Sequence, residues 1–229
     1  MNVSLKNRFD EIRSLPSFAE RIAALRGQGS GCRMWLLSCG PSLPRFHSAF
    51  ILSGDIVVAV KQALRVYPLA DFQLFNHVNF EPFDRAEREA SDCNPLTIGY
   101  SVTGLDIDLP LQSPGWSMSS RVREFGKLEI LDGALFGEIG KFHYGPGIVY
   151  EVALPLAVHL GVSEIVSVGF DCEDRQTRHF YDDTQGDNGG GGGGSRSQEH
   201  DEIRGAMPAW REWLEGKGVD WVRLGRPWK

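Results

Sequence analysis

Residues 144–171, YGPGIVYEVALPLAVHLGVSEIVSVGFD, decide the fold of this chain, because they join a glycine turn, a helix and a strand in one short unit. The segment 148–160 carries only two strongly polar side chains, so it is predicted to be a helix covered on most of its surface. Gly161 follows, where helices commonly end on a left-handed residue. The apolar, β-branched run Ile165–Phe170 then predicts a strand buried on both faces of a parallel sheet.

The carboxyl end of that strand is the first place to look for a binding site. Open α/β sheets bind their ligands in the crevice just beyond the carboxyl ends of the strands. In this chain that edge is marked by Gly169 and Asp171 after the strand and by the turn Gly145–Gly147 before the helix. These residues are therefore the first candidates for ligand contacts.

The composition of the 229 residues is that of an ordinary globular protein, with 41% hydrophobic and 24% charged residues. A formal net charge of −6 argues against general affinity for nucleic acids. The four cysteines are widely spaced, which favours reduced thiols over a zinc site. Neither a signal peptide nor a transmembrane segment is indicated. We expect a cytoplasmic protein, and both peripheral membrane association and homo-oligomerisation stay open.

The remaining segments predict one α/β domain, 1–229, with a mostly parallel sheet and a flexible loop that could serve as a lid. Residues 1–30 form an N-terminal helical extension broken near Pro16 and followed by a Gly27–Gly31 linker, and residues 172–200 form the lid region. Six consecutive glycines, Gly189–Gly194, predict flexibility, whether the run is natural or engineered. The other expected elements are strands at Met34–Leu37, Ile56–Val60, Phe72–Phe75, Leu96–Val102 and Trp221–Leu224, a loop at Leu111–Gly126 and a helix at Gln198–Gly216.

A second glycine turn, Ser38-Cys39-Gly40-Pro41-Ser42, follows the first predicted strand. A turn of this kind can offer backbone N–H groups to a phosphate. It matches neither the dinucleotide-binding fingerprint nor a Walker A loop, so a purely structural turn is the alternative.

Other polar groups suggest chemistry with less specificity. Asp106 and Asp108 have the spacing of a metal-binding D-x-D pair, and an exposed strand face explains them equally well. Among the acidic residues near the end of the buried strand, only Asp171 directly ends it. His143, His179 and His200 are candidates for a general base, because imidazole titrates near neutral pH.

Three segments together resemble one family. LLSCGPSL (36–43) is similar to the first-strand motif of the bacterial family 42 sialyltransferases, the Maf-type flagellin glycosyltransferases and the archaeal-type pterin pyrophosphokinases. IVVAVKQAL (56–64) resembles their second strand. Residues 145–171, followed by HFYDD (179–183), resemble their central helix, their strand ending in Gly-x-Asp and their aromatic loop.

The resemblance implies a single Rossmann-like α/β domain with a mostly parallel sheet, helices on both faces and a flexible lid loop. It also implies a metal-independent, inverting transfer of a nonulosonic or similar sugar from a CMP-activated donor to a glycan or protein hydroxyl. It requires no cofactor. The nucleotide would contact Gly40, Pro41, Ser42, Lys61, Asn76, Gly147, Gly169 and Asp171. The catalytic candidates are His200 as the lid base, with Tyr181 and, less favoured, His179 at the phosphate.

Departures from the family pattern leave alternatives open. Cys39 and Lys61 replace two family asparagines, whereas Asn76 keeps a third. A Mg²⁺-dependent pterin pyrophosphokinase-like transferase would instead use Asp171 and Asp182 as metal ligands. A non-catalytic nucleotide- or glycan-binding relative is the other alternative.

Overall fold

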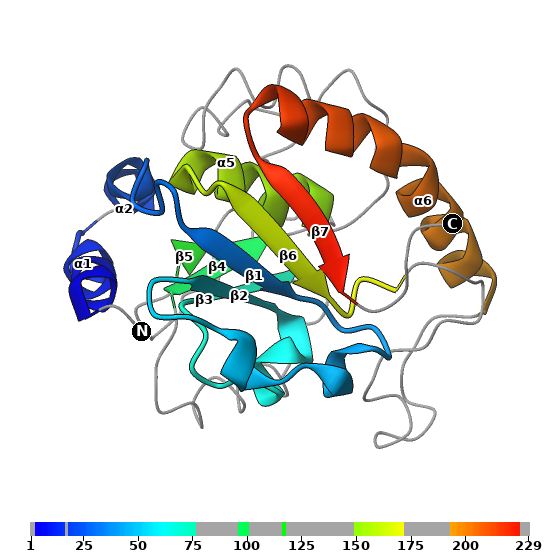
Figure 1. Cartoon of the computed structure of the whole chain (residues 1–229), viewed down its shortest axis with the longest axis horizontal. Coiled ribbons are helices and arrows are strands. Elements are labelled where there is room, and N and C mark those ends of the chain that lie inside the picture. Colours follow the sequence, from blue (N-terminus) through cyan, green and yellow to red (C-terminus); the bar gives the residue numbers. More distant parts are fainter. Residues whose placement is uncertain are drawn as a thin grey trace.

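The computed structural model describes residues 3–16, 18–76, 96–100, 116–117, 149–171 and 193–224. Within these residues, seven strands form one sheet in the order β5-β4-β3-β2-β1-β6-β7 (Figure 1). Every neighbouring pair of strands is parallel, which confirms the predicted fold class. The strands are β1 (Arg33–Leu37), β2 (Ile56–Val60), β3 (Phe72–Asn76), β4 (Leu96–Tyr100), β5 (Trp116–Ser117), β6 (Glu164–Val168) and β7 (Asp220–Leu224).

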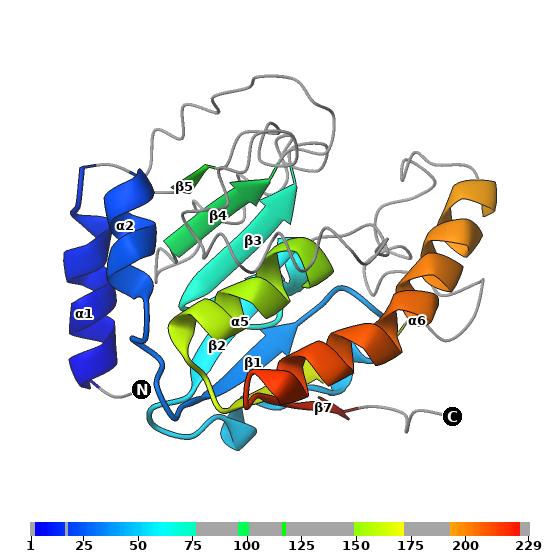
Figure 2. The same cartoon turned by 90° about the horizontal axis from the view of Figure 1, so that it is seen from above.

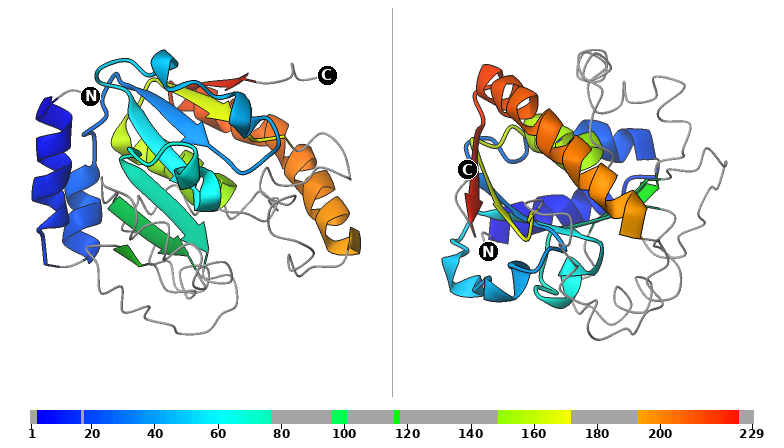
Figure 3. Two further views of the ribbon diagram at one scale, coloured as in Figure 1. Left: turned by 90° about the horizontal axis from the view of Figure 1, so that it is seen from below. Right: turned by 90° about the vertical axis from the view of Figure 1, so that its right-hand side faces the viewer.

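Helices α5 (Leu154–Leu160) and α6 (Gly193–Gly216) lie over one face of the sheet, with α6 running above the β6–β7 edge (Figure 2). Helices α1 (Val3–Arg13) and α2 (Phe18–Leu25) lie side by side near the starting ends of the strands. Among the described residues, the opposite face carries three short 3-10 helices: η1 (Leu43–Arg45), η2 (Ser48–Phe50) and η3 (Lys61–Arg65) (Figure 3).

Residues 149–171 of the stretch 144–171 are described, and they take the expected path with one local difference. A π-helical turn, η6 (Val149–Ala153), precedes α5. Pro155 follows this wide turn and has no N–H for the carbonyl four residues earlier, so a regular α-helical ladder is interrupted there. Gly161 then ends the helix at φ +76°, as its position predicted.

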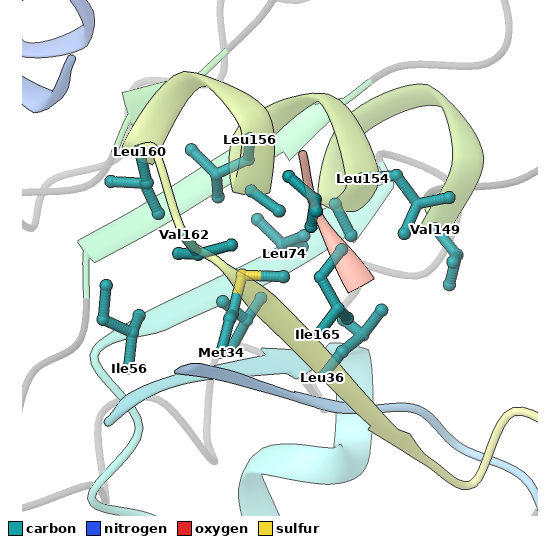
Figure 4. Close-up of a cluster of buried hydrophobic side chains, with 14 of the residues drawn as sticks. Met34, Leu36, Ile56, Leu74, Val149, Leu154, Leu156, Leu160, Val162 and Ile165 are labelled. Carbon is teal, nitrogen blue, oxygen red and sulfur yellow. The ribbon is translucent and has the colours of Figure 1, made fainter. Parts of the chain in front are cut away.

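The core fills both sides of the sheet, because strands buried on two faces need an apolar layer on each. Beneath α5, side chains from the helix interdigitate with those of the strands, among them Met34, Leu36 and Ile165 (Figure 4). On the other face, Trp35, Leu37 and Val57 pack against the 3-10 segments. The burial of all five residues of β2 follows from this double covering.

The Gly27–Gly31 segment is more than the predicted linker. Its amides donate to the carbonyl end of α5: Gly27 N to His159 O at 2.9 Å, and Gly29 N to Leu160 O at 2.8 Å. A Cβ atom on Gly29 would lie 2.6 Å from Ile56 Cδ1, so a larger residue here would require the Ile56 side chain to move. The segment therefore satisfies the carbonyl groups that a helix leaves exposed at its C-terminus.

Two further predictions need correction. Helix α6 begins at Gly193 and not at Gln198, so the last two glycines of the six-glycine run are helical. The packing of Met207, Trp210 and Leu214 anchors this helix, and helix propagation from an anchored turn costs less than nucleation. The short strand β5 lies inside the segment predicted to be only a loop, where Trp116 and Ser117 pair with β4.

Candidate nucleotide site

The strand order changes direction between β1 and β6. From β1 the chain adds β2, β3, β4 and β5 on one side, and then returns to place β6 and β7 on the other. Such a switch point opens a crevice at the carboxyl ends of the two central strands. Here those ends carry two turns that contain predicted site residues, Ser38–Ser42 after β1 and Gly169–Asp171 after β6. The other glycine turn predicted from the sequence, Gly145–Gly147, lies outside the described residues.

Hydrogen bonds join these two turns directly. The Gly40 amide donates to the Gly169 carbonyl at 2.7 Å. The Gly169 amide donates to Ser42 Oγ at 3.1 Å, and the Ser42 amide donates to Asp171 Oδ2 at 2.7 Å. The structure thus brings together four of the predicted site residues.

The glycines are dictated by this close approach. A Cβ atom on Gly40 would collide with the Gly169 carbonyl oxygen and lie 2.6 Å from Asp171 Oδ2. Gly169 has φ +74°, and a Cβ there would collide with the Ser38 carbonyl. Both positions therefore require glycine for packing, and Gly169 also for its backbone conformation.

These contacts change what the first turn can offer a ligand. The amides of Gly40 and Ser42 donate to Gly169 and Asp171, and the Leu43 amide donates to the Gly40 carbonyl at 3.0 Å. The turn therefore links the ends of β1 and β6, and its Gly40 and Ser42 N–H groups are not available to a phosphate. A contact from Gly40, Pro41 or Ser42 to the nucleotide stays a prediction, carried by groups other than these amides.

Lys61 lies at the carboxyl end of β2, the strand next to β1. Its φ is +51°, and it is the only non-glycine residue with a positive φ among those that the structure describes. A left-handed backbone at a residue with a long side chain costs free energy, and such strain gathers at functional sites. Lys61 therefore places a basic residue at the carboxyl end of the strand next to β1.

Polar side chains surround the Lys61 backbone. The amide of Gln73 donates through Nε2 to the Lys61 carbonyl at 3.5 Å. The Cys39 thiol donates to the Val60 carbonyl at 3.1 Å and lies 3.8 Å from Gln62 Oε1. The side chains of Cys39, Gln62 and Gln73 are all buried. Cys39, which stands where the family motif has an asparagine, therefore contacts the end of β2 and not solvent.

The remaining predicted residues are placed only in part. Asn76 is the last residue of β3, at the same edge of the sheet, and His200 lies in α6. The side chains of both, and all of Gly147, His179 and Tyr181, lie outside the described residues.

Two residues at this edge were not singled out from the sequence. Arg223, in β7, donates through Nη1 to the Phe170 carbonyl at 3.2 Å, which places a guanidinium beside the turn of β6. Ser38, 5% exposed, begins the first turn. In the sequence, Arg223 can be recognised only as a single basic residue in the otherwise apolar run Trp221–Leu224. Its strand lies next to the one that ends near Asp171.

Neither a cluster of metal ligands nor a membrane-spanning helix is present in the described ranges. There, no three His, Cys, Asp or Glu residues gather in a way that could hold a metal ion. No helix in the same ranges combines the length and apolar character needed to cross a membrane.

The fold is similar to that of solved sialyltransferases. The sialyltransferase CstII from Campylobacter jejuni, in complex with cytidine-5'-monophosphate, aligns with 85% of this chain and 80% of its own at a TM-score of 0.52 and 13% identity. The monofunctional α-2,3-sialyltransferase Cst-I from Campylobacter jejuni aligns with 85% of this chain and 76% of its own, also at 0.52 and 13% identity. No family model and no curated protein sequence matches. At this identity the likeness confirms the predicted resemblance at the level of the fold.

Proposed function

We propose that this chain is a glycosyltransferase that moves a nonulosonic or similar sugar from a CMP-activated donor to a hydroxyl of a glycan or glycoprotein. The observation that carries the proposal is the pair of interlocked glycine turns at the β1–β6 switch point, where folds of this class bind nucleotides. The CMP named for the solved CstII complex supports the choice of nucleotide.

The proposed reaction is a single inverting displacement. The acceptor oxygen forms a bond to the anomeric carbon while the bond from that carbon to the donor phosphate breaks. The acceptor hydroxyl loses its proton to a general base, and CMP leaves with the bonding electrons. Negative charge therefore grows on the phosphate, and cations at fixed positions stabilise it.

Lys61 and Arg223 are suited to that charge stabilisation, because they lie at the ends of strands on either side of β1 and β6. Asp171 uses one carboxylate oxygen to hold the first turn in place. We propose that its other oxygen accepts from a hydroxyl or amino group of the nucleoside. Asp171 is thus a binding group and His200 the base in this proposal, with Tyr181 at the phosphate.

Titration calorimetry with CMP, CDP, UDP and ATP, each with and without Mg²⁺, tests the proposal. Saturable binding of CMP without Mg²⁺ is the expected result. Magnesium-dependent binding of ATP, with no response to a cytidine nucleotide, would favour the pyrophosphokinase-like alternative.

The base is tested by His200→Ala with a CMP-sugar donor and a glycan acceptor. We expect turnover to fall roughly 10²- to 10⁴-fold, the usual contribution of general base catalysis, with CMP affinity retained. Equal turnover in both proteins would remove His200 from the mechanism. CMP binding without turnover in either protein would favour the non-catalytic alternative.

A further inference from the structure

Ser38 carries a buried hydroxyl that makes no hydrogen bond to the described residues. It is the first residue after β1, and its amide donates to the Val168 carbonyl at 2.8 Å, which continues the ladder to β6. The residue is 5% exposed, and Ser38 Oγ has no hydrogen-bond partner within the described part of the chain. Buried hydroxyl groups nearly always have a partner, because leaving one without any costs free energy.

Ser42, in the same turn, provides the contrast. It is also buried, at 8% exposure, but its Oγ accepts from the Gly169 amide at 3.1 Å. The Ser42 hydroxyl therefore holds the two turns together. The Ser38 hydroxyl makes no comparable hydrogen bond within the described residues.

The position of Ser38 places its hydroxyl group at the switch point. Side chains alternate along a strand, so Ser38 faces the same side as Leu36, beneath the layer of α5, whereas Cys39 belongs to the opposite apolar cluster with Leu37. The Ser38 carbonyl lies against Gly169, at the point where a Cβ would collide with it. The residue is thus enclosed between the ends of β1 and β6.

We propose that Ser38 Oγ donates a hydrogen bond to a phosphate oxygen of the bound nucleotide. This inference rests on the proposed function. The Gly40 and Ser42 amides are occupied within the protein, so the side-chain hydroxyls are donors that this turn still offers. Of these, the Ser42 hydroxyl already accepts from the Gly169 amide, whereas Ser38 Oγ has no hydrogen-bond partner within the described residues. The cost of leaving the hydroxyl without a partner is recovered when the nucleotide binds, which makes Ser38 a binding residue rather than a structural one.

Ser38→Ala tests this, with Ser42→Ala as the matched control from the same turn. Thermal unfolding should show an unchanged or higher Tm for Ser38→Ala and a lower Tm for Ser42→Ala, which leaves the Gly169 amide without its acceptor. Calorimetry should show CMP affinity reduced roughly tenfold or more by Ser38→Ala, as expected for a lost hydrogen bond to a charged group, with affinity for cytidine unchanged.

Each other result overturns the assignment in a recognisable way. Equal CMP affinity in wild type and Ser38→Ala would overturn the inference and leave the proposed function standing. An equal loss of CMP and cytidine affinity would move the contact to the nucleoside and reject the phosphate. A Tm as low as that of Ser42→Ala would make Ser38 structural. Absence of CMP binding in the wild type would reject both the inference and the proposed function.

Discussion

The amide of Ser42 donates to Asp171 Oδ2 at 2.7 Å, and this bond joins residues 129 positions apart in the chain. It holds the end of β1 against the end of β6. Asp171 is the residue that the sequence marked because it ends the central strand. The same residue thus shapes the turn that faces it, which makes the two sides of the proposed site depend on one carboxylate.

Asp171→Ala is expected to destabilise the protein by about 1–3 kcal/mol, because the Ser42 amide loses its acceptor in a partly buried setting. Urea unfolding measures this change. Asp171→Asn keeps an acceptor oxygen and should cost less than the alanine variant. Asp220→Ala, at an exposed residue, is the control and should leave stability within about 0.5 kcal/mol. Equal stabilities for Asp171→Ala and Asp220→Ala would contradict the account.

Alanine substitutions of two glycines should act in opposite directions. Gly169→Ala combines a positive φ with a collision against the Ser38 carbonyl, so we expect it to destabilise the fold by more than about 2 kcal/mol. Gly205 lies inside α6 with nothing within 4 Å of the added Cβ. Gly205→Ala should therefore stabilise by up to about 1 kcal/mol. Thermal unfolding of the two variants and the wild type measures both changes. A Gly169→Ala variant as stable as the wild type would contradict the described turn.

Lys61 should show opposite effects on stability and on binding. Lys61→Gly removes the strain of φ +51° and is expected to stabilise the fold by up to about 1 kcal/mol. The same variant loses the ammonium group, so its CMP affinity should fall about tenfold. Lys61→Ala should lose the affinity without gaining stability, since alanine keeps the strain. If both variants bind CMP as the wild type does, the side chain has no role in donor binding.

The Cys32 thiol should react slowly in the folded protein. Burial, and to a smaller extent the nearby Asp55 carboxylate, raise the pKa of this thiol above its ordinary value. A raised pKa means less thiolate at any given pH, so the midpoint of alkylation against pH should lie higher than in the urea-unfolded chain. Mass spectrometry of the peptide containing Cys32 measures both midpoints. Equal midpoints in the folded and the unfolded protein would show that the fold does not raise the pKa of the Cys32 thiol.

Much of the architecture was predictable because it follows from local patterns. Runs such as Ile56–Val60 are rich in β-branched residues, and the structure places a strand there with the predicted bounds. The meeting of the Ser38–Ser42 turn with the Gly169–Asp171 turn was predictable as well, since the carboxyl ends of parallel strands lie at one edge of the sheet.

What the sequence did not reveal depends on contacts between distant residues. Nothing local to Gly40 or Ser42 shows that their amides are occupied, because their acceptors come from Gly169 and Asp171. The sequence also gives no sign of the left-handed backbone at Lys61, since lysine is not a residue that favours this conformation. Arg223 was overlooked because its relevance comes from the pairing of β7 with β6.

A crystal structure of the protein soaked with CMP would locate the nucleotide. We expect density for CMP over the carboxyl ends of β1 and β6, with its phosphate within hydrogen-bond distance of Ser38 Oγ and near the Lys61 ammonium. Density for CMP at any other place on the molecule, or none at a saturating concentration, would contradict this expectation.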